Sequence, residues 1–486
     1  MKDRFRPAFH FTPPNNWLND PNGLVYYEGE YHLFYQHNPD SPTWGPMYWG
    51  HAISTNLIEW RHLPVALAPD QHGTIFSGSV VVDWKDTTGF FNGKPGLVAI
   101  FTHNLNDPER KQRLQRQSLA YSPDSGRSWI KYAANPVLAD EHEDDFRDPK
   151  VFWHADTRSW IMVLALNNRI RIYASPDLIH WSLQSEFGEK SGDHGGVWEC
   201  PDLFELPIDG DIRNKKWVML VSVGTHPERP EGSRTQYFIG EFDGRTFVND
   251  HGEGETLWLD GGRDNYAGVS WSDIPPDDGR RIYIGWMSNW KYANVTPSQG
   301  WRGAMTLPRE LSLGSSAEGV RLFQRPIAEL RQWRQTPHEW RNVHLSPGKS
   351  IEFDLQTGTL EIRAEFEPDT AANFGLKIRK GESEETIIGY NTTQRLLYID
   401  RTRSGITDFH DDFPCKHGML AALQNGKINL HIIVDHASVE VFAQNGEHAM
   451  TDLIFPDPGS CSLEVFTEEG GMRLIGLTVY PIRRCV

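Results

Sequence analysis

The chain has 486 residues and a formal net charge of -17 at neutral pH. An acidic surface repels both a nucleic-acid backbone and an anionic membrane, so a neutral ligand suits this protein better. No apolar stretch approaches the roughly 18 residues that a membrane-spanning helix requires. We therefore expect no nucleic acid and no membrane as partner, and we interpret the one basic run, Arg110 to Arg116, as a solvated loop without a function.

Four cysteines are present, and they are too few and too widely spaced for a disulfide framework or a C-x-x-C zinc site. We expect reduced thiols. The acidic segment 140–146 lacks the alternating ligands of a calcium loop, so we expect no metal and no cofactor. The chain starts without the apolar core of a signal peptide, which favours the cytoplasm, with secretion as the alternative if a signal peptide has been removed.

The sequence is typical of an all-β protein. It contains 43 glycines and 31 prolines, and long apolar stripes with a period of 3.6 residues are nearly absent. Short runs rich in β-branched and aromatic residues, bounded by turn residues, predict buried strands. Examples in chain order are YHLFYQH, PGLVAIFTH, SWIMVLAL, KWVMLVSV and RRIYIGWM.

A repeating unit covers residues 1–315. The units lie roughly 50 to 70 residues apart and each holds about four short strands, as in the blades of a β-propeller. Five units fit, so we predict a five-bladed propeller. Each unit begins with a polar or small residue before an apolar strand, at Asp20, Ser77, Asp148, Glu199 and Asp264. If these strands are innermost in their blades, their starts meet at one end of the central channel.

The pattern changes after the fifth unit. We expect a linker with a short helical turn at residues 316–343, followed by a two-sheet β-sandwich at residues 344–486. The second domain has no cluster of acids that matches those of the first. We interpret it as a module that packs against the propeller, with carbohydrate binding as the alternative.

Three acidic residues at unit starts have neighbours that suit different chemical roles. Asp20 lies beside Asn19 in a polar turn, which should keep it ionised, as a nucleophile requires. Glu199 has largely apolar neighbours, which favour the protonated form that a general acid needs. Arg147 should keep Asp148 charged, which suits an anion that stabilises an oxocarbenium-like transition state.

Each of these motifs alone is an ordinary structural turn. Their equivalent places in a repeat favour a joint catalytic site, because a turn has no reason to be acidic each time. Other polar and aromatic side chains are candidates for binding hydroxyl groups or stacking on a sugar ring, although most tryptophans must fill the core.

Six motifs occur in the order WLNDPNG, FYQHNP, WGHAIS, FSGS, RDPKVFW and WECPDLF. In this order they closely resemble glycoside hydrolase family 32, the β-fructofuranosidases, and segment 266–311 is most similar to the levanases and exo-inulinases of that family. The resemblance implies a five-bladed β-propeller followed by a β-sandwich, retention of configuration and no metal.

The resemblance also implies roles for single residues. Asp20 becomes the nucleophile, Asp148 the transition-state stabiliser and Glu199 the acid/base. The residues that would bind the terminal fructosyl unit are Asn19, Gln36, Trp44, Phe76, Ser77, Arg147 and Trp286.

We therefore expect a retaining, exo-acting β-fructosidase that releases fructose from levan and inulin and also cleaves sucrose. A funnel that is closed at its base holds only a chain end, which favours exo action. The alternatives are an invertase restricted to sucrose or a fructosyltransferase, a sugar-binding propeller without activity, and an inverting arabinan-type enzyme.

Overall fold

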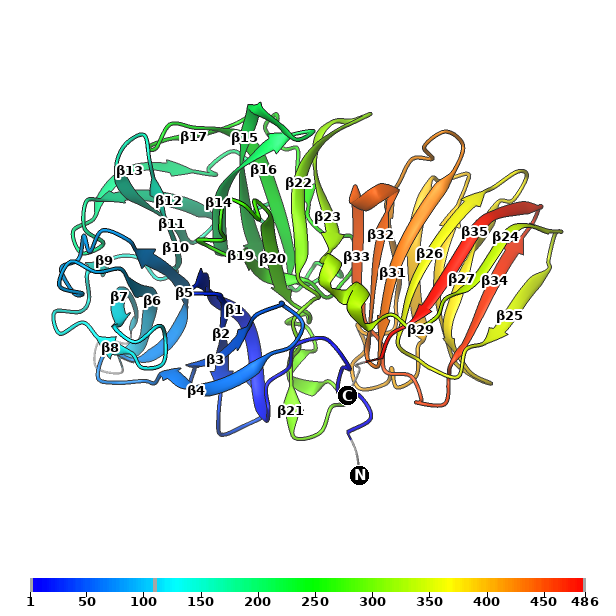
Figure 1. Ribbon diagram of the computed structural model, residues 1–486, viewed down its shortest axis with the longest axis horizontal. Helices are drawn as coiled ribbons and strands as arrows, with labels where there is room; N and C mark the ends of the chain where they lie inside the picture. Colours follow the sequence, from blue (N-terminus) through cyan, green and yellow to red (C-terminus); the bar gives the residue numbers. More distant parts are fainter. Residues whose placement is uncertain (1–2, 108–111, 484–486) are drawn as a thin grey trace.

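The computed structural model describes residues 3–107 and 112–483, and over this range it consists almost entirely of β-strands. A propeller, formed by the N-terminal part of the chain, lies beside a β-sandwich formed by the C-terminal part (Figure 1). The predicted all-β fold class is thus confirmed. None of the described helices is long and apolar enough to cross a bilayer.

Antiparallel sheets of consecutive strands form the first three blades. The first contains β1 (Asn16–Tyr27), β2 (Glu30–Asn38), β3 (Tyr48–Ser54) and β4 (Arg61–Leu67). The second contains β5 (Thr74–Asp83), β6 (Gly96–Asp107), β7 (Gln112–Ser122), β8 (Ile130–Lys131) and β9 (Leu138–Ala139). The third contains β10 (Phe146–His154), β11 (Ser159–Leu166), β12 (Arg169–Ser175) and β13 (Ser182–Phe187).

Blades four and five are joined by a short parallel pairing between β14 and β22. The fourth contains β14 (Trp198–Ile208), β15 (Asp211–Val223), β16 (Arg234–Phe242), β17 (Phe247–Asn249) and β18 (Leu257–Trp258). The fifth contains β19 (Tyr266–Ser270), β20 (Arg281–Trp286), β22 (Arg309–Ser316) and β23 (Gly319–Pro326). Between β20 and β22 lie the 3-10 helix η1 (Ala293–Val295) and β21 (Trp301–Arg302), which pairs with β1.

Backbone hydrogen bonds close the ring between the first and last blades. The N–H of Tyr26 donates to the carbonyl of Ser272 at 2.9 Å, and the N–H of Ser272 donates to the carbonyl of Leu24 at 2.9 Å. These bonds join β1 to the residues that follow β19. The innermost strands of all five blades therefore surround one channel.

Most of the predicted linker, residues 316–343, belongs to strands of the two domains. β23 pairs with β22 along its whole length, which places it in the fifth blade. The short helical turn is η2 (Ala328–Trp333), and β24 (His338–Leu345) already pairs with a strand of the sandwich. β23 buries two of its eight residues and β24 only one, so their apolar pattern was too weak to mark them as strands in the sequence.

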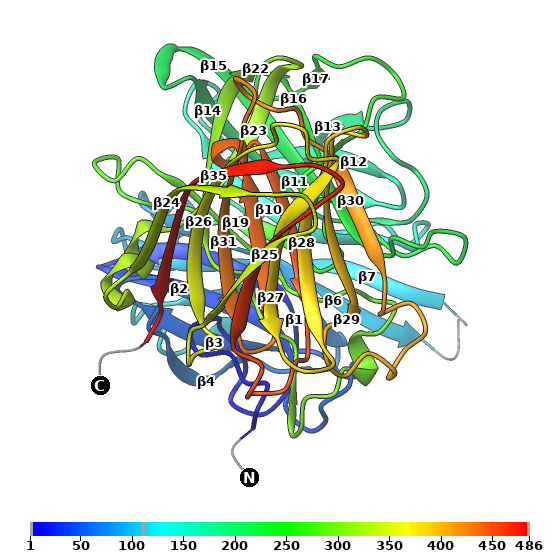
Figure 2. The same ribbon diagram turned by 90° about the vertical axis from the view of Figure 1, so that its right-hand side faces the viewer.

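Two six-stranded sheets form the sandwich, which Figure 2 shows in front of the propeller. One sheet has β24, β35 (Met472–Pro481), β26 (Leu360–Glu367), β31 (Ile428–Asp435), β32 (Ser438–Ala443) and β33 (His448–Leu453). The 3-10 helix η3 (Gln444–Gly446) precedes β33. The other sheet has β25 (Ser350–Asp354), β34 (Ser462–Glu468), β27 (Asn373–Lys380), β28 (Glu385–Asn391), β29 (Leu396–Arg403) and β30 (Lys416–Leu420).

The two domains meet at an interface that buries charged groups. β32 and β33 lie next to β22 and β23 (Figure 1). The ring nitrogens of His10 lie 2.7 Å from Asp435 and 2.7 Å from Glu440, and Arg309 lies 2.5 Å from Glu440. All four side chains are fully buried. Because removing one partner would leave a charge buried and unpaired, these contacts fix how the domains dock.

Replacing His10 by Asn is expected to change how stability depends on pH. Burial lowers the pKa of His10, but the hydrogen bonds and charges of Asp435 and Glu440 outweigh it and raise this pKa to about 9. Stability from protonated His10 is therefore complete below its ordinary pKa of 6.5 and is lost as the pH rises through about 9. The loss should be on the order of 3 kcal/mol.

Thermal unfolding measured between about pH 6 and pH 10 tests this expectation. The midpoint of the native protein should fall over this range, and His10→Asn should show a much shallower decline. His338→Asn, an exposed position in β24, is the matched control and should behave like the native protein. Equal slopes for His10→Asn and the native protein would contradict the assignment.

Candidate active site

The innermost strand of every blade has an irregularity in its pairing near its start. A β-bulge inserts an extra residue, bends the strand and re-aims its side chains. The register shifts between these residue pairs: Leu18 and Pro21 in β1, Ile75 and Gly78 in β5, Arg147 and Lys150 in β10, Glu199 and Asp202 in β14, Tyr266 and Val269 in β19. Four of the five unit starts identified in the sequence thus coincide with bulges, and the fifth, Asp264, lies just before β19.

Proline and left-handed backbone mark these bulges. Pro21, Pro149 and Pro201 lie within three of them, where a ladder hydrogen bond is not required and the missing N–H costs little. Asp148 and Cys200 have φ values of 65° and 46°, a conformation that is costly for a residue with a side chain. The surrounding ring therefore holds a strained backbone at the predicted site.

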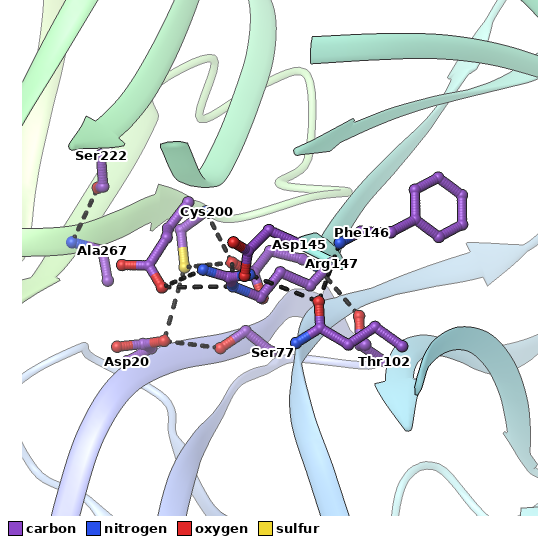
Figure 3. Close-up of polar contacts among 12 residues, drawn as sticks. Asp20, Ser77, Thr102, Asp145, Phe146, Arg147, Cys200, Ser222 and Ala267 are labelled. Atoms are coloured by element: carbon purple, nitrogen blue, oxygen red, sulfur yellow. Dashed lines mark hydrogen bonds and ion pairs between the residues drawn. The ribbon is translucent and has the colours of Figure 1, made fainter. Parts of the chain in front are cut away.

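A cavity of about 430 Å³ lies at this end of the propeller channel. Its lining consists of Asn19, Asp20, Gln36, Trp44, Phe76, Ser77, Arg113, Arg147, Asp148, Glu199, Trp290 and Asn294. All three predicted acids share this lining. Figure 3 shows Asp20 and Ser77 on one side, with Arg147 and Cys200 approaching from the other.

Asp20 is held by two side-chain donors. The hydroxyl of Ser77 donates to Oδ2 at 2.8 Å, and the amide of Asn19 donates to Oδ1 at 2.9 Å. Burial and the nearby charge of Glu199 raise the pKa of Asp20 to about 6, against the lowering effect of these hydrogen bonds. The carboxylate is therefore mostly ionised at neutral pH, although its pKa is higher than a polar turn suggested.

Asp148 departs further from its expected state. Burial raises its pKa to about 7; Arg147 opposes this shift, while the charges of Glu199 and Asp20 add to it. The backbone N–H of Cys200 donates to Asp148 Oδ2 at 3.0 Å. Arg147 lowers this pKa as expected, but burial outweighs it, because Arg147 Nε lies 3.9 Å from Asp148 while Nη2 lies 3.0 Å from Glu199.

Glu199 lies in a polar environment rather than the expected apolar one. Its side chain is 24% exposed, and Nη2 and Nε of Arg147 donate to Oε1 at 3.0 and 3.3 Å. The hydroxyl of Tyr266 donates to the other oxygen, Oε2. The expectation failed because the neighbours Trp198 and Cys200 are buried in the core, away from the open side of the cavity.

Trp286 is a correction to the predicted binding residues. Its side chain is fully buried and is absent from the cavity lining. The ring of Trp290 lies 4.7 Å from it, between centroids, and lines the cavity instead. Both tryptophans pack against Trp17, so Trp286 supports the aromatic wall from behind.

Two residues of the core of the site were not predicted from the sequence. Cys200 is buried, and its sulfur lies 3.6 Å from both Asp20 Oδ2 and Asp148 Oδ2. The pair Cys200-Pro201 stands at the position in its blade that Asp20-Pro21 and Asp148-Pro149 occupy in blades one and three. This equivalence could have identified Cys200 as a residue of the site. Tyr266 follows a unit start but carries no motif, so nothing in the sequence marked its contact with Glu199.

The cavity rim also contains unpredicted residues. Arg113 belongs to the basic run that we interpreted as a solvated loop without a function, yet it lines the cavity. Its guanidinium carbon lies 5.3 Å from the ring centre of Phe76. Asn294 in η1 also lines the cavity, and its side chain accepts a hydrogen bond from the backbone N–H of Trp44 at 2.9 Å. Part of the basic run, residues 110–111, lies outside the described residues.

Sequence comparison identifies the family. Residues 10–326 match the glycosyl hydrolases family 32 N-terminal domain, and residues 328–481 match the C-terminal domain of the same family. The chain belongs to glycoside hydrolase family 32. The resemblance drawn from the six sequence motifs is confirmed, and the five-bladed propeller followed by a β-sandwich is the architecture of this family 32 enzyme.

Individual relatives extend over the whole chain. A levanase of Bacillus subtilis (strain 168) is 50% identical over 485 residues, which cover 99% of this chain and 71% of the levanase. An extracellular exo-inulinase of Aspergillus awamori is 36% identical over 518 residues, which cover 98% of this chain and 94% of that protein. The crystal structure of exo-inulinase from Aspergillus awamori has a TM-score of 0.90 at 36% identity and covers 98% of both chains.

Asp148→Asn is expected to stabilise the family 32 fold at neutral pH. Because burial raises the pKa of Asp148 from 3.8 to about 7, the stability linked to this group is complete below 3.8 and is lost as the pH rises through about 7. An amide carries no charge and still accepts the hydrogen bond from Cys200. The thermal midpoint should therefore rise by a few degrees at about pH 8 and approach that of the native protein near pH 4.

The same measurement on Asp277→Asn provides the control, because Asp277 is exposed and its replacement should leave the midpoint unchanged. A lower midpoint for Asp148→Asn than for the native protein at about pH 8 would show that ionised Asp148 stabilises the fold, contrary to this account.

Proposed function

We propose that this protein is a retaining, exo-acting β-fructosidase that hydrolyses terminal β-D-fructofuranosyl residues of levan and inulin, and also sucrose. The observation that carries this proposal is the convergence of Asp20, Asp148 and Glu199 on one cavity. Family membership and the levanase and exo-inulinase relatives support it. A sugar-binding propeller without activity would not need three carboxyl groups around one site.

In the proposed first step, a carboxylate oxygen of Asp20 attacks C2 of the fructosyl unit. The bond to the leaving oxygen breaks, and Glu199 gives that oxygen a proton. The donors Ser77 and Asn19 hold Asp20 in place. Asp148, which also lines the cavity, provides negative charge that stabilises the oxocarbenium-like transition state when it is ionised.

In the second step, Glu199 acts as the base. It takes a proton from water, whose oxygen attacks C2 and releases fructose, so that Asp20 is free again. Arg147 and Tyr266 hold the two oxygens of Glu199, which positions this group for both proton transfers. Two displacements at C2 return the original configuration.

The closed floor of the cavity supports exo action. Below it, the channel narrows to a void of about 10 Å³, lined among others by Pro21, Pro149, Pro201 and Lys150. A void of this size holds at most about one water molecule. A polymer therefore cannot thread through the channel, and only a chain end reaches Asp20.

Product analysis on levan and inulin over time tests the activity. The native protein should release fructose without early oligosaccharides, and NMR should show the β-anomer first. Early oligosaccharides would contradict exo action, and the α-anomer would indicate an inverting enzyme. Cleavage of sucrose without any cleavage of the polymers would favour a sucrose-restricted invertase, and transfer to sugar acceptors would favour a fructosyltransferase.

Asp20→Asn should reduce kcat on sucrose by at least about 10³-fold, since about 4 kcal/mol of barrier depends on the nucleophile. Asn keeps the size of the side chain, so the thermal midpoint should not fall. Asp277→Asn, which is exposed, should have native activity. Native turnover in Asp20→Asn would exclude the nucleophile assignment.

Tyr266→Phe tests the positioning of Glu199. Loss of the hydroxyl that donates to Oε2 should lower kcat on sucrose by about 10- to 100-fold with little change in KM. The loss should be smaller for an aryl fructoside with a good leaving group, which needs less proton donation. Tyr283→Phe is the control, because Tyr283 is buried and donates to Asn265 rather than to a cavity residue. Equal losses on both substrates would assign Tyr266 a structural role.

The substrate class also bears on location. Levan and inulin are polymers that do not cross a membrane, so a fructan-degrading enzyme meets them outside the cell. We therefore favour secretion over the cytoplasm, and the relative from Aspergillus awamori is itself described as extracellular.

A further inference from the structure

A second, larger cavity lies at the opposite end of the propeller channel. It has a volume of about 530 Å³ and is formed where β5, β10 and β14 run toward their ends and where the chain leaves β19. Its aromatic lining consists of Trp84, Phe152, Trp153, Trp160, Phe204 and Trp217. None of these residues lines the cavity that holds Asp20.

The two cavities are separate chambers. The narrow void between them is lined by Pro149 and Lys150, of which Lys150 also lines the second cavity. Lys150 Nζ donates to the carbonyl of Ser270 at 2.5 Å and lies 3.4 Å from Asp202. These contacts fix a buried charge across the channel, so a ligand in one chamber does not reach the other.

Four of the aromatic side chains of the second cavity, those of Trp84, Phe152, Trp153 and Trp217, are at least partly exposed, while Trp160 and Phe204 are buried. Trp84 is 56% exposed, while its indole N–H donates to Asp273 at 2.8 Å. The rings of Phe152 and Trp217 lie 5.6 Å apart between centroids, and Lys85 Nζ lies 5.5 Å from the ring of Trp153. Fixed aromatic faces of this kind suit the apolar face of a sugar ring, since they lose little conformational entropy on binding.

The charges of the cavity nearly cancel. Its lining contains four acidic residues and three basic ones, namely Asp83, Asp202, Glu205, Asp273, Lys85, Lys150 and Arg281. Arg281 uses Nη1 to donate to the carbonyl of Trp271 at 3.1 Å, and its other nitrogens carry further donors. A balanced set of charges favours a neutral ligand with many hydroxyl groups over a phosphate or a peptide of one sign.

Two of the four carboxyl groups hold the walls of this cavity. Asp202 accepts hydrogen bonds from the backbone N–H of Leu203 at 2.8 Å and from the backbone and hydroxyl of Ser270 at 2.6 and 2.7 Å. Asp273 accepts from Trp84 and from the backbone N–H of Val82. Both hold the walls of the cavity, and Asp202 is fully buried, so it cannot reach a bound sugar.

We propose that this second cavity binds a segment of a neutral fructan chain without cleaving it. The identity of the sugar rests on the proposed function. A chain bound here keeps the enzyme on its polymer between cleavage events, which raises the effective concentration of chain ends at the cavity that holds Asp20. Sucrose is a disaccharide and cannot occupy both cavities at once, so its cleavage does not depend on the second cavity.

Kinetics on two substrates give the first test. Trp153→Ala should raise KM for levan several-fold and leave kcat and KM for sucrose unchanged, and the more exposed Trp84→Ala should do the same. Leu183→Ala removes a 52% exposed apolar side chain of β13 outside both cavities, and it should match the native protein on both substrates. Unchanged KM for levan in both tryptophan variants would overturn the proposal.

Calorimetric titration with a short β-2,6-linked fructo-oligosaccharide gives the second test. In the Asp20→Asn background, which separates binding from turnover, we expect two sites per chain, and one after Trp153→Ala is added. A single site that Trp153→Ala leaves intact would overturn the proposal. Maltotriose, a glucan of similar size, should not fill the second site; if it does, fructan selectivity is wrong.

The two tests also separate this inference from the proposed function. If the native protein fails to cleave levan and sucrose, the proposed function is wrong, whereas the number of binding sites still reports on the second cavity. If cleavage is normal and only one binding site is found, the inference about the second cavity is wrong and the proposed function still stands.

Discussion

The candidate site depends on one constraint of the backbone, the bulge that interrupts each innermost strand at the same level. Side chains of a regular strand alternate between its two faces, and the inserted residue changes which side chains reach the channel. Asp148 and Cys200 adopt a left-handed backbone conformation within these bulges. The closed ring opposes relaxation of these residues, because each innermost strand packs between neighbouring blades. Rigidity of the ring is therefore what brings three carboxyl groups, which repel one another when charged, into one cavity.

Crowded carboxyl groups explain the electrostatics of the site. The charge of Glu199 raises the pKa of both Asp20 and Asp148, and Asp20 also raises that of Asp148. The guanidinium of Arg147 donates hydrogen bonds to Glu199. The sandwich contributes indirectly. Arg401 of β29 forms a fully buried ion pair with Asp264 at 2.6 Å, directly before β19 begins at Tyr266. The second domain thus anchors the segment that presents a hydroxyl to Glu199.

The sequence allowed the propeller, the sandwich and the neighbourhood of the three acids to be predicted, because repeats and turn residues are local signals. Finer features depended on distances that no sequence pattern contains. The guanidinium of Arg147 lies closer to the carboxylate of Glu199 than to that of its chain neighbour Asp148. Trp290, not Trp286, faces the cavity, since the irregular segment after β20 has no periodicity from which a side could be assigned. Likewise, β23 belongs to the propeller through hydrogen bonds with β22, and a strand with so few buried residues gives little sign of this pairing in the sequence.

The closure of the ring has a consequence for the order in which the molecule can form. β1 bonds to residues near position 272, and the N–H of Ala8 donates to Asp435 at 2.8 Å. During synthesis, the first blade emerges long before either of its distant partners exists. Contacts between residues so far apart in the sequence make folding slow. Until these partners are synthesised, the edge of β1 that will face them stays unpaired. A nascent chain of this architecture is thus exposed to wrong pairing until nearly its last strands have left the ribosome.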